Sequence, residues 1–412
     1  MVSYKSLLAF SAAVLPAVLA APSTHPGHLK IRQLGDQAEI IPGSYIVVFE
    51  PSADPALVEA HEQRLVGLRK RDTNSSAVEH TYSVQDFKGY SIAADETTIA
   101  EIAAAPEVAF VEPDQIMRSY ALTTQSGSTW GLGRISHRER GSSSYIYDTT
   151  GGAGTRVYVV DTGIRTTHNQ FGGRAVQGAN FISGESAADL QGHGTHCAGT
   201  VGGSTYGVAK AATLVGVKVL NSAGEGTNSG VIAGMNWVAT NAQSLGMSTK
   251  SVMSMSLGGG VSQATNNAVN AVFNSGVTVV VAAGNEDQLA SNTSPGSAAN
   301  AITVGAIGQD DARSVWDCPQ PCGSNYGSAV DIFAAGTDVL SSHIASNTAT
   351  RSLSGTSMAC PHVAGLAAYL ISLEGLSSPT AVVNRIKALA TTGRVTDLQG
   401  SPNLLAYNGN GA

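Results

Sequence analysis

Runs of consecutive apolar residues alternate with helical patterns from Trp130 onward. Strand candidates are residues 156–160, 214–219, 252–256, 277–282, 301–304 and 330–333. Helical patterns cover residues 194–201, 229–242, 263–274 and 358–371. Several of the strands are continuously apolar, which suits a parallel sheet buried on both faces. We therefore expect a doubly wound α/β domain whose site lies at the carboxyl ends of its strands.

An earlier segment, residues 44–112, has a different pattern. We expect strands at 45–49, 78–82, 90–93 and 108–111 and helices at 55–71 and 96–105. The first helix would bury Leu57, His61, Leu65 and Leu68 on one face. This β-α-β-β-α-β order predicts a small ferredoxin-like α+β domain. The polar segment after it, residues 112–128, is expected to be an irregular linker or a cleavage site.

The N-terminus and the composition limit the class of protein. Lys5, an apolar run over residues 7–19 and the small pair Ala20-Ala21 predict a secretory signal peptide over residues 1–20. No later stretch reaches the ~18 consecutive apolar residues of a membrane helix, so no membrane partner is expected. The 412 residues carry a net charge of −7 without a long basic run, so we expect no nucleic-acid partner either.

The stretch Gly355-Thr356-Ser357-Met358-Ala359 leads from small residues into an apolar, Ala-rich run. We interpret the run as a buried helix with Ser357 in its first turn. Unpaired backbone N–H groups and the positive end of the helix dipole would stabilise an oxyanion that forms there. A serine at a helix start is more often only a helix cap, so Ser357 alone does not establish a nucleophile.

Three further turns carry polar residues that the fold does not require. Asp161 follows the apolar run 157–160, His193 lies between glycines before a helix, and Asn285 follows a buried strand. Each has a simpler interpretation as a turn residue or a surface histidine. With Ser357, however, they make up the set that acyl transfer by serine needs. An imidazole takes the hydroxyl proton, a carboxylate orients the imidazole, and an amide donates to the oxyanion, with no catalytic cofactor.

Other classes of function fit these residues less well. His193 and His196 could be zinc ligands on one helix, but no further ligand follows at metal spacing. A lipase of the α/β-hydrolase type would need G-x-S-x-G and the order Ser, Asp, His, and residues 355–359 do not match. A secreted binding protein without activity is possible on the same fold, but all four catalytic groups are present.

Three segments carry a family resemblance. Residues 161–163, 193–200 and 355–359 resemble the signature segments of the subtilisin-like serine proteases, in that family's order Asp, His, Ser. Residues 206–210, 256–260, 282–285 and 324–328 resemble the proteinase K branch and its fungal secreted alkaline proteases. The resemblance runs from about Trp130 to Tyr407. It implies a subtilisin-like fold and a secreted serine endopeptidase that acts on protein and peptide substrates, outside the cell or, alternatively, in a vacuole.

The resemblance also gives a role to the first domain. It is similar to the family's inhibitory propeptide, which is removed by self-cleavage. Residues 21–120 would then be the propeptide, an intramolecular inhibitor, and residues 121–412 the peptidase domain, expected to be a monomer. Cleavage between Tyr120 and Ala121 requires Tyr120 to fit the enzyme's own primary pocket, so we expect a preference for aromatic or large apolar residues before the scissile bond.

Site residues follow from the resemblance position by position. Asp161, His193 and Ser357 would be the catalytic triad, and Asn285 would form the oxyanion hole. The residues expected to bind substrate are Gly224, Gly226, Ser256, Leu257, Gly258, Ala283 and Gly284. Bare glycine backbone would let a substrate lie alongside as an added strand. Glu225 could attract a positive charge at an outer subsite, although a solvated glutamate is the simpler interpretation.

The remaining candidates concern stability and modification. Asp331, with the carbonyls of Ala299 and Ala301, aligns with a structural calcium site of the proteinase K branch. Cys318 and Cys322 could close a small disulfide loop, whereas Cys197 and Cys360 are expected to be free and buried. Asn74 and Asn292 lie in N-x-S/T sequons and are candidate glycosylation sites.

Overall fold

The computed structural model describes residues 30–32, 40–68, 77–116, 122–318 and 322–411. The chain divides into two compact units, Met1–Arg118 and Ser119–Ala412. The expected signal peptide, residues 1–20, lies outside the described residues.

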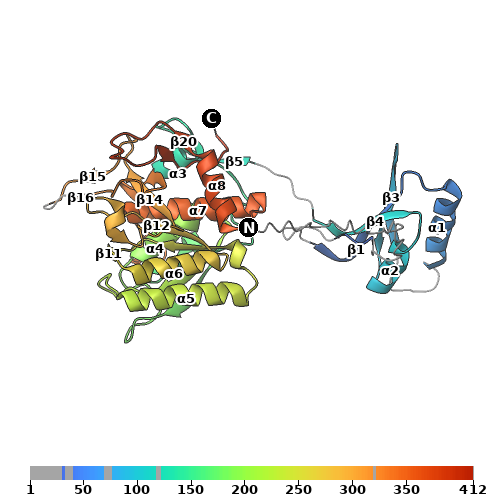
Figure 1. Cartoon of the computed structure of the whole chain (residues 1–412), viewed down its shortest axis with the longest axis horizontal. Helices are drawn as coiled ribbons and strands as arrows, with labels where there is room; N and C mark the ends of the chain where they lie inside the picture. Colours follow the sequence, from blue (N-terminus) through green and yellow to red (C-terminus); the bar gives the residue numbers. More distant parts are fainter. Residues whose placement is uncertain (1–29, 33–39, 69–76, 117–121, 319–321, 412) are drawn as a thin grey trace, which may run out of the picture. The chain divides into compact units, whose positions relative to one another are not determined.

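The N-terminal unit contains a four-stranded antiparallel sheet with two helices (Figure 1). The strand order is β2-β3-β1-β4, which confirms the ferredoxin-like arrangement. Its elements are β1 (Ile40–Phe49), α1 (Pro55–Leu68), β2 (Ala77–Val84), β3 (Phe87–Ala93), α2 (Glu96–Ala103) and β4 (Val108–Gln115).

The buried face of α1 differs from the predicted one at its start. Leu57 is 47% exposed, and the neighbouring Val58 packs against the core with Leu65 instead. His61 is buried as predicted because both ring nitrogens have partners. Nδ1 lies 2.7 Å from the Glu107 carboxylate and Nε2 lies 2.9 Å from the Tyr90 hydroxyl. A buried imidazole on this face is therefore satisfied by hydrogen bonds.

The second unit is organised around a nine-stranded sheet, in the order β20-β21-β17-β14-β12-β10-β7-β9-β8. The pairs from β8 to β21 are parallel, and among the described strands of this sheet only the short pair β20–β21 is antiparallel. The strands are β7 (Arg156–Asp161), β8 (Ala175–Asn180), β9 (Thr213–Lys218), β10 (Ser251–Met255), β12 (Thr278–Ala282), β14 (Ile302–Ile307), β17 (Ile332–Ala335), β20 (Thr391–Thr392) and β21 (Leu404–Leu405). The doubly wound, mostly parallel sheet is thus confirmed.

Side chains of the central strands alternate between two buried layers. Val157 and Val159 of β7 join one core with helices α4 (His193–Gly202) and α7 (Thr356–Glu374). Tyr158 and Val160 point to the other face and pack with α5 (Asn228–Ser244) and α6 (Gln263–Asn274). Figure 1 shows α5 and α6 side by side on that face. Both faces are covered, which explains why these strands are continuously apolar.

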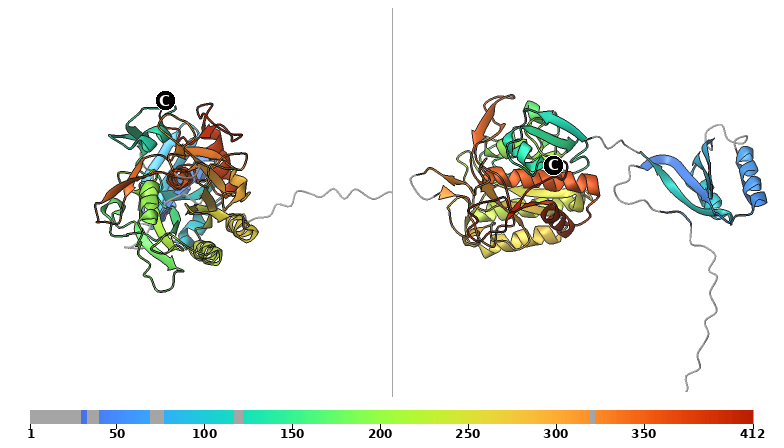
Figure 2. Two further views of the ribbon diagram at one scale, coloured as in Figure 1. Left: turned by 90° about the vertical axis from the view of Figure 1, so that its left-hand side faces the viewer. Right: turned by 90° about the horizontal axis from the view of Figure 1, so that it is seen from above.

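Helix α7 lies in the middle of the second unit (Figure 2). It is long and apolar enough to cross a membrane by length and composition, contrary to the expectation that no such stretch follows the N-terminus. Within the unit, however, 83% of that segment is buried. Small residues allow this packing, since a Cβ at Gly365 would lie 2.8 Å from Val208 and 2.9 Å from the Val201 carbonyl. Its apolar composition is that of a central core helix.

Several elements escaped the sequence analysis. They are β5 (Leu122–Ser126), β6 (Ser144–Asp148), α3 (Trp130–Ser136), β11 (Gly259–Gly260), β13 (Thr293–Ser294), β15 (Val315–Trp316), β16 (Cys322–Gly323), β18 (Val339–Ser342), β19 (Thr350–Leu353) and α8 (Pro379–Leu389). The expectation of an irregular linker over residues 112–128 was wrong at both ends. Residues 112–115 complete β4, and β5 pairs with β6. Polar residues form strands there because a partner strand provides hydrogen bonds for their backbone N–H and C=O groups.

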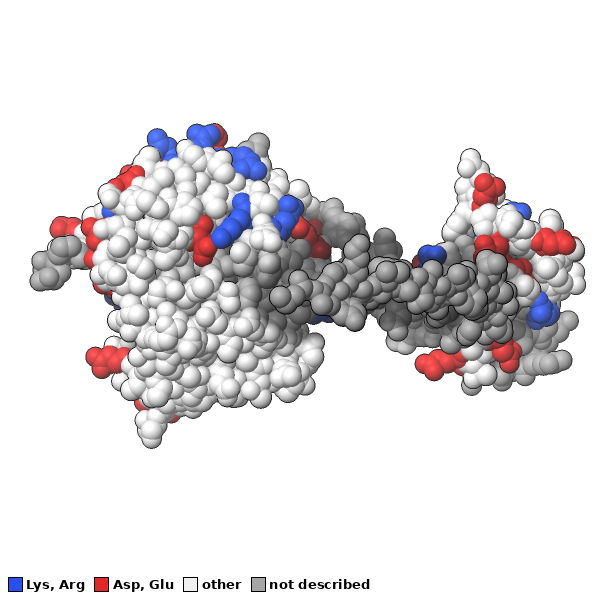
Figure 3. Space-filling model, viewed as in Figure 1, with Lys and Arg blue, Asp and Glu red and all other residues white. Residues whose placement is uncertain are grey.

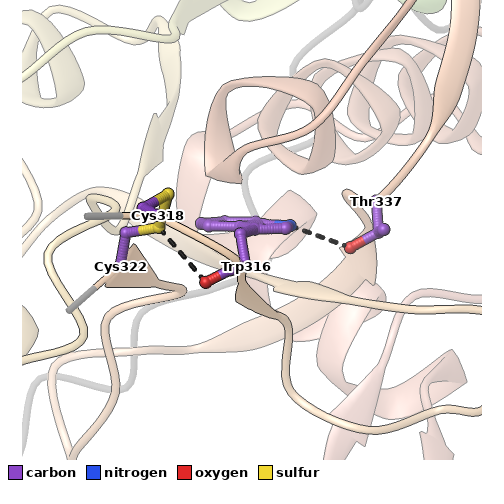
Figure 4. The surroundings of a disulfide bond; sticks show 4 residues. All are labelled: Trp316, Cys318, Cys322 and Thr337. Carbon is purple, nitrogen blue, oxygen red and sulfur yellow. Dashed lines mark hydrogen bonds between the residues drawn. A yellow bond between two sulfur atoms is a disulfide. The ribbon is translucent and has the colours of Figure 1, made fainter. Parts of the chain in front are cut away.

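Cysteines behave as expected within the described residues. Cys318 and Cys322 form a disulfide beside β15 and β16, and Trp316 in the same hairpin donates its ring N–H to Thr337 (Figure 4). Cys197 and Cys360 are free and buried.

Charges are sparse on one face of the second unit. On the face shown in Figure 3, acidic and basic side chains are interspersed over its upper part, and few lie on its lower part.

Candidate active site

Asp161 ends the central strand β7 and is completely buried. Its Oδ1 accepts a hydrogen bond from the following backbone N–H, of Thr162, at 2.7 Å. Both carboxylate oxygens lie within 2.9 Å of Nδ1 of His193. A buried carboxylate needs such partners, so the strand end and the imidazole hold each other in place.

His193 is the first residue of α4. The helix approaches the turn after β7 very closely, since a Cβ at Gly194 would lie 2.2 Å from the Gly163 carbonyl. Only glycine fits there. The buried Asp189 joins the same two segments. Its carboxylate accepts from the Thr162 hydroxyl at 2.8 Å and from the Thr195 backbone N–H, in the first turn of α4, at 2.9 Å.

The Asp161 carboxylate sets the protonation of His193. Burial by itself lowers the pKa of the imidazole, but the charge and hydrogen bond of Asp161 outweigh it, and the pKa is raised well above its usual value. Cys197 Sγ lies 3.9 Å from Nδ1, but burial raises the pKa of this thiol, so it is neutral near pH 7. With Nδ1–H donating to Asp161, Nε2 of the neutral ring is free to accept a proton.

Ser357 is the second residue of α7, as predicted for the first turn of a helix. Its hydroxyl donates to the Ser256 carbonyl at 3.1 Å, and the hydroxyl of Ser256 donates back to the Ser357 carbonyl at 2.9 Å. The Ser357 hydroxyl is therefore bound to the end of β10 rather than to His193. Ser357 and His193 nevertheless line the same two cavities.

Asn285 follows the carboxyl end of β12 and is held by the start of α7. Its Oδ1 accepts from the backbone N–H of Thr356 at 2.8 Å and from the Thr356 hydroxyl at 2.9 Å. Because the carbonyl side of the amide is occupied in this way, the NH₂ group is the side left to donate. Asn285 lines both cavities beside Ser357.

The first cavity, of about 550 Å³, contains most of the residues expected to bind substrate. Gly224, Gly226, Ser256, Leu257, Gly258 and Gly284 all line it. Ala283 does not, which corrects the expectation for this position. Its side chain is fully buried, and its carbonyl accepts from Thr293 and Asn325. The neighbouring Ala282 lines the cavity in its place.

The second cavity, of about 290 Å³, also borders Ser357. Gln191, Gly192 and Met358 lie near the catalytic candidates, and the far wall comes from β18, β19 and their connection. That wall is lined by His343, Arg351, Leu353 and Ser354. The sequence analysis did not identify these four residues or Asp189. Asp189 could have been found as an acidic residue just before a helix N-terminus.

The other candidate sites are placed as follows. Tyr120, Ala121 and Asn74 lie outside the described residues. Asn292 is exposed at the end of a short 3₁₀ turn, where it is accessible to modification.

The metal hypotheses do not fit these residues. His196 is buried, its Nε2 lies 3.0 Å from the carbonyls of both Val339 and Arg351, and burial lowers its pKa to about 4. It is therefore engaged in holding β18 and β19. At the expected calcium site, the Asp331 carboxylate accepts from Lys387 Nζ at 2.7 Å and from a backbone N–H at 2.9 Å. With its charge already paired, Asp331 does not combine with Ala299 and Ala301 as a calcium site.

Comparisons with known proteins agree with this geometry. A family model described as Subtilase family matches residues 152–411, and one described as Peptidase inhibitor I9 matches residues 44–120. Subtilisin-like protease 2 of Pseudogymnoascus destructans is 53% identical over 409 residues, covering 99% of each chain. Alkaline protease 1 of Aspergillus clavatus is 47% identical over 418 residues, covering 99% of this chain and 100% of the relative.

A solved structure extends the comparison to the fold. It is described as the crystal structure of a cold adapted subtilisin-like serine proteinase and is 42% identical, with a TM-score of 0.63. The match covers 69% of this chain and 99% of the other. The matched family model, the full-length relatives and the shared fold establish that this chain belongs to the subtilase family and is a serine endopeptidase preceded by an I9-type inhibitor domain.

Proposed function

We propose that the protein is a secreted endopeptidase of broad specificity, made as a zymogen, in which Asp161, His193 and Ser357 form the triad. The observation that carries the proposal is the pairing of the buried Asp161 carboxylate with His193 Nδ1 at 2.8 Å, beside Ser357 and Asn285 at the edge of one cavity. These groups supply the base, the nucleophile and the oxyanion donor of acyl transfer.

Acylation begins with a rotation of the Ser357 side chain away from the Ser256 carbonyl toward His193. Nε2 accepts the hydroxyl proton while Oγ attacks the scissile carbonyl carbon. The tetrahedral oxyanion receives hydrogen bonds from the Asn285 NH₂ group and the Ser357 backbone N–H. The imidazolium, stabilised by Asp161, then gives its proton to the leaving amine, and the carbon–nitrogen bond breaks.

Deacylation repeats these steps with water. His193 takes a proton from the water that attacks the acyl ester, and the same two donors stabilise the second oxyanion. The Ser357 oxygen leaves with the proton returned by His193, and the carboxylic acid product departs. The chain's own residues are sufficient for both halves of the reaction.

Substrate preference is inferred from the first cavity. Small side chains and bare backbone, among them Ala282, Gly258 and Gly296, line it near Ser357. A large aromatic or aliphatic side chain can fill such a space and bury apolar surface. We therefore infer a preference for aromatic or large apolar residues immediately before the scissile bond, which Tyr120 would satisfy.

Maturation is inferred from the I9 domain. Residues 21–120 would act as an intramolecular inhibitor until the bond between Tyr120 and Ala121 is cut by the enzyme itself. The expected signal peptide at residues 1–20 and the alkaline protease relatives support extracellular action, with a vacuole as the alternative location. We expect the enzyme to act as a monomer.

The test is expression of the full chain, N-terminal sequencing of the product, and cleavage profiling with a peptide library. We expect a mature N-terminus at Ala121 and cleavage mainly after Phe, Tyr, Leu or Met. Cleavage mainly after Lys or Asp would refute the proposed preference, and an uncleaved chain that cuts no peptide would refute the proposed function.

A further inference from the structure

The two cavities beside Ser357 are lined by opposite charges. The larger cavity is lined by two carboxylates, Glu225 and Glu286, and by no Lys or Arg among the described residues. The smaller one is lined by Arg351 and His343, and no carboxylate is among its described lining residues. A substrate that spans Ser357 therefore meets a different electrostatic environment on each side of the scissile bond.

The hairpin wall, which consists of His343, Arg351, Leu353 and Ser354, is attached to α4, the helix that begins at His193. In β18 and β19, Ser341 pairs with Arg351 across the hairpin. The buried His196, one turn after His193 on α4, lies 3.0 Å from the carbonyls of Val339 and Arg351, one from each strand. In return, the Ser341 hydroxyl donates to the His196 carbonyl at 2.8 Å. The backbone of Arg351 is thus fixed relative to His193.

The tip of the hairpin, residues 343–349, is also held by contacts with other segments. Arg165 donates to the Ile344 carbonyl at 3.1 Å and to Asn347 at 2.9 Å. The His343 ring packs against Gly192, where a Cβ would lie 3.0 Å from Nε2. Gly192 has a φ of +110°, so both its conformation and the imidazole beside it require glycine there.

Arg351 has its charge available. Its side chain is exposed, and no carboxylate forms an ion pair with it in the part of the chain that the structure describes. Some other arginines of the unit do have such partners, for example Arg313 with Asp287 and Asp397. A guanidinium that faces a cavity beside the nucleophile without an internal partner is suited to bind a carboxylate of a ligand.

The position of the cavity identifies the part of the substrate it would contact. Under the proposed function, the segments around Gly224–Gly226 and Ser256–Gly258 bind the residues before the scissile bond, and they line the larger cavity. The smaller cavity is not lined by these segments. It shares Ser357, His193 and Asn285 with the larger cavity and is walled by β18 and β19, so the residues that follow the scissile bond would enter it.

We propose that the hairpin wall is a specificity site for acidic residues that follow the scissile bond, with Arg351 as the main contact and His343 as a second one. This inference rests on the proposed function and adds a class of substrate to it: chains in which Asp or Glu comes within the first three residues after the cleaved bond. Because the contact is exposed, we expect a preference of about threefold to tenfold in kcat/KM over Lys at the same position.

The experiment uses the mature enzyme and internally quenched peptides. All peptides share one half that ends in Phe before the scissile bond, and the other half is Ala except for one Asp or one Lys at the first, second or third position. The wild type should cleave the Asp peptide about threefold to tenfold faster than the Lys peptide at one of these positions at least. This ratio should fall toward one between about 0.02 M and about 0.5 M NaCl, because salt screens exposed charges.

Variants assign the effect to its residues. Arg351→Glu should invert the Asp-to-Lys ratio, Arg351→Gln should bring it close to one, Arg351→Lys should retain most of it, and His343→Gln should reduce it. The matched control is Arg140→Glu, which changes the net charge equally at an exposed residue that lines neither cavity and should leave the ratio unchanged.

The outcomes separate this inference from the function it rests on. A wild type that cleaves all the peptides with a ratio of one, or a ratio insensitive to salt, overturns the acidic preference and leaves the endopeptidase intact. The same holds if Arg140→Glu changes the ratio as much as Arg351→Glu does. A wild type that cleaves no peptide and no p-nitroanilide with the same first half overturns both. If Arg351→Glu does not mature, the Arg351→Gln variant and the salt series still show whether Arg351 causes the preference for acidic residues.

Discussion

The two cavities that meet at Ser357 are walled by different kinds of structure. The larger one is built from short glycine-rich segments that follow buried strands, such as Ser256–Gly258 after β10. The smaller one is closed by the hairpin of β18 and β19, which presents the guanidinium group of Arg351. The first arrangement suits recognition of any extended peptide backbone, whereas the second can discriminate between side chains. Under the proposal above, general proteolysis and selectivity are assigned to two different cavities that both border Ser357.

The largest effect is expected from a substitution of Ser357, which borders both cavities, because it would abolish cleavage itself. Ser357→Ala should lower kcat by about six orders of magnitude, because the chemistry needs the hydroxyl whichever residues flank the bond. Since this variant would not mature by itself, it is processed by added wild-type enzyme, which is then removed before kcat is measured. Near-normal turnover of the purified variant would end the assignment of the nucleophile.

Asn285 borders both cavities, so its replacement should lower the cleavage rate equally for peptides that differ after the scissile bond. Asn285→Ala should lower kcat about 10²–10³-fold, or ~3–4 kcal/mol, with little change in KM, because the amide donates mainly to the transition state. Steady-state kinetics on the Asp and Lys peptides described above would measure this. A loss confined to KM, or to one of the two peptides, would argue for a role in binding.

The pH profile tests the pairing of Asp161 with His193. His193 must be neutral to accept a proton, so activity is lost as pH falls through its pKa, by about tenfold for each unit below it. From the ordinary value of ~6.5, the rise would fall at roughly pH 6–8. Because Asp161 raises the pKa of His193 well above that value, the midpoint of the rise should lie toward the alkaline side.

Measurements of kcat/KM against pH give this midpoint. Asp161→Asn should move it to lower pH in the residual activity, since the raising charge is gone. An unchanged midpoint in that variant would contradict the electrostatic role of Asp161. Cys197 also lies near the ring but contributes less, so Cys197→Ser should move the midpoint less than Asp161→Asn does.

Glu225 provides a smaller test on the side of the larger cavity. Glu225→Gln should reduce kcat/KM about twofold to fivefold for peptides with Arg several residues before the scissile bond, because an exposed charge pair is weak. The ratio between Asp and Lys after the bond should be unaffected. If Glu225→Gln changed that ratio, the two cavities would not be electrostatically separate.

The smallest effect on activity is expected from the disulfide. Cys318 and Cys322 are separated by 4 positions, so the bond restricts only a short loop. Replacing both by Ser should cost about 2 kcal/mol of stability in the chain-entropy model. Activity should fall less than about threefold, since Asn285 keeps its Thr356 partners and loses at most the support of the Gly323 N–H, 3.1 Å from its carbonyl. Thermal unfolding and kcat measured on the same preparation would check this.

The contrast between the cavities also explains what the sequence could predict. Asp161, Asn285 and Ser256 follow apolar runs, and parallel strands bring their carboxyl ends to one edge, so these positions could be found without a structure. The hairpin could not. Its strands are four residues each, β19 is largely exposed, and their pairing depends on His196, a contact between distant parts of the chain.

Other misses have related causes. The strand β8 (Ala175–Asn180) contains Gln177, Gly178 and Asn180 and shows no apolar run, yet it pairs with β9. Such an edge strand is selected by its neighbour more than by its own composition. The Asp331–Lys387 contact joins residues 56 positions apart, so the alignment that suggested calcium could not reveal that a lysine had already neutralised the carboxylate.

The most direct test of the shared nucleophile is to label the mature enzyme with a fluorophosphonate and to map the adduct by mass spectrometry of its peptides. The adduct should be on Ser357. It should be lost in His193→Ala, because the Ser357 hydroxyl then has no base to take its proton. The denatured wild type should not react either. An adduct on another residue, or labelling of Ser357 at an undiminished rate in His193→Ala, would contradict the arrangement of Asp161, His193 and Ser357 described here.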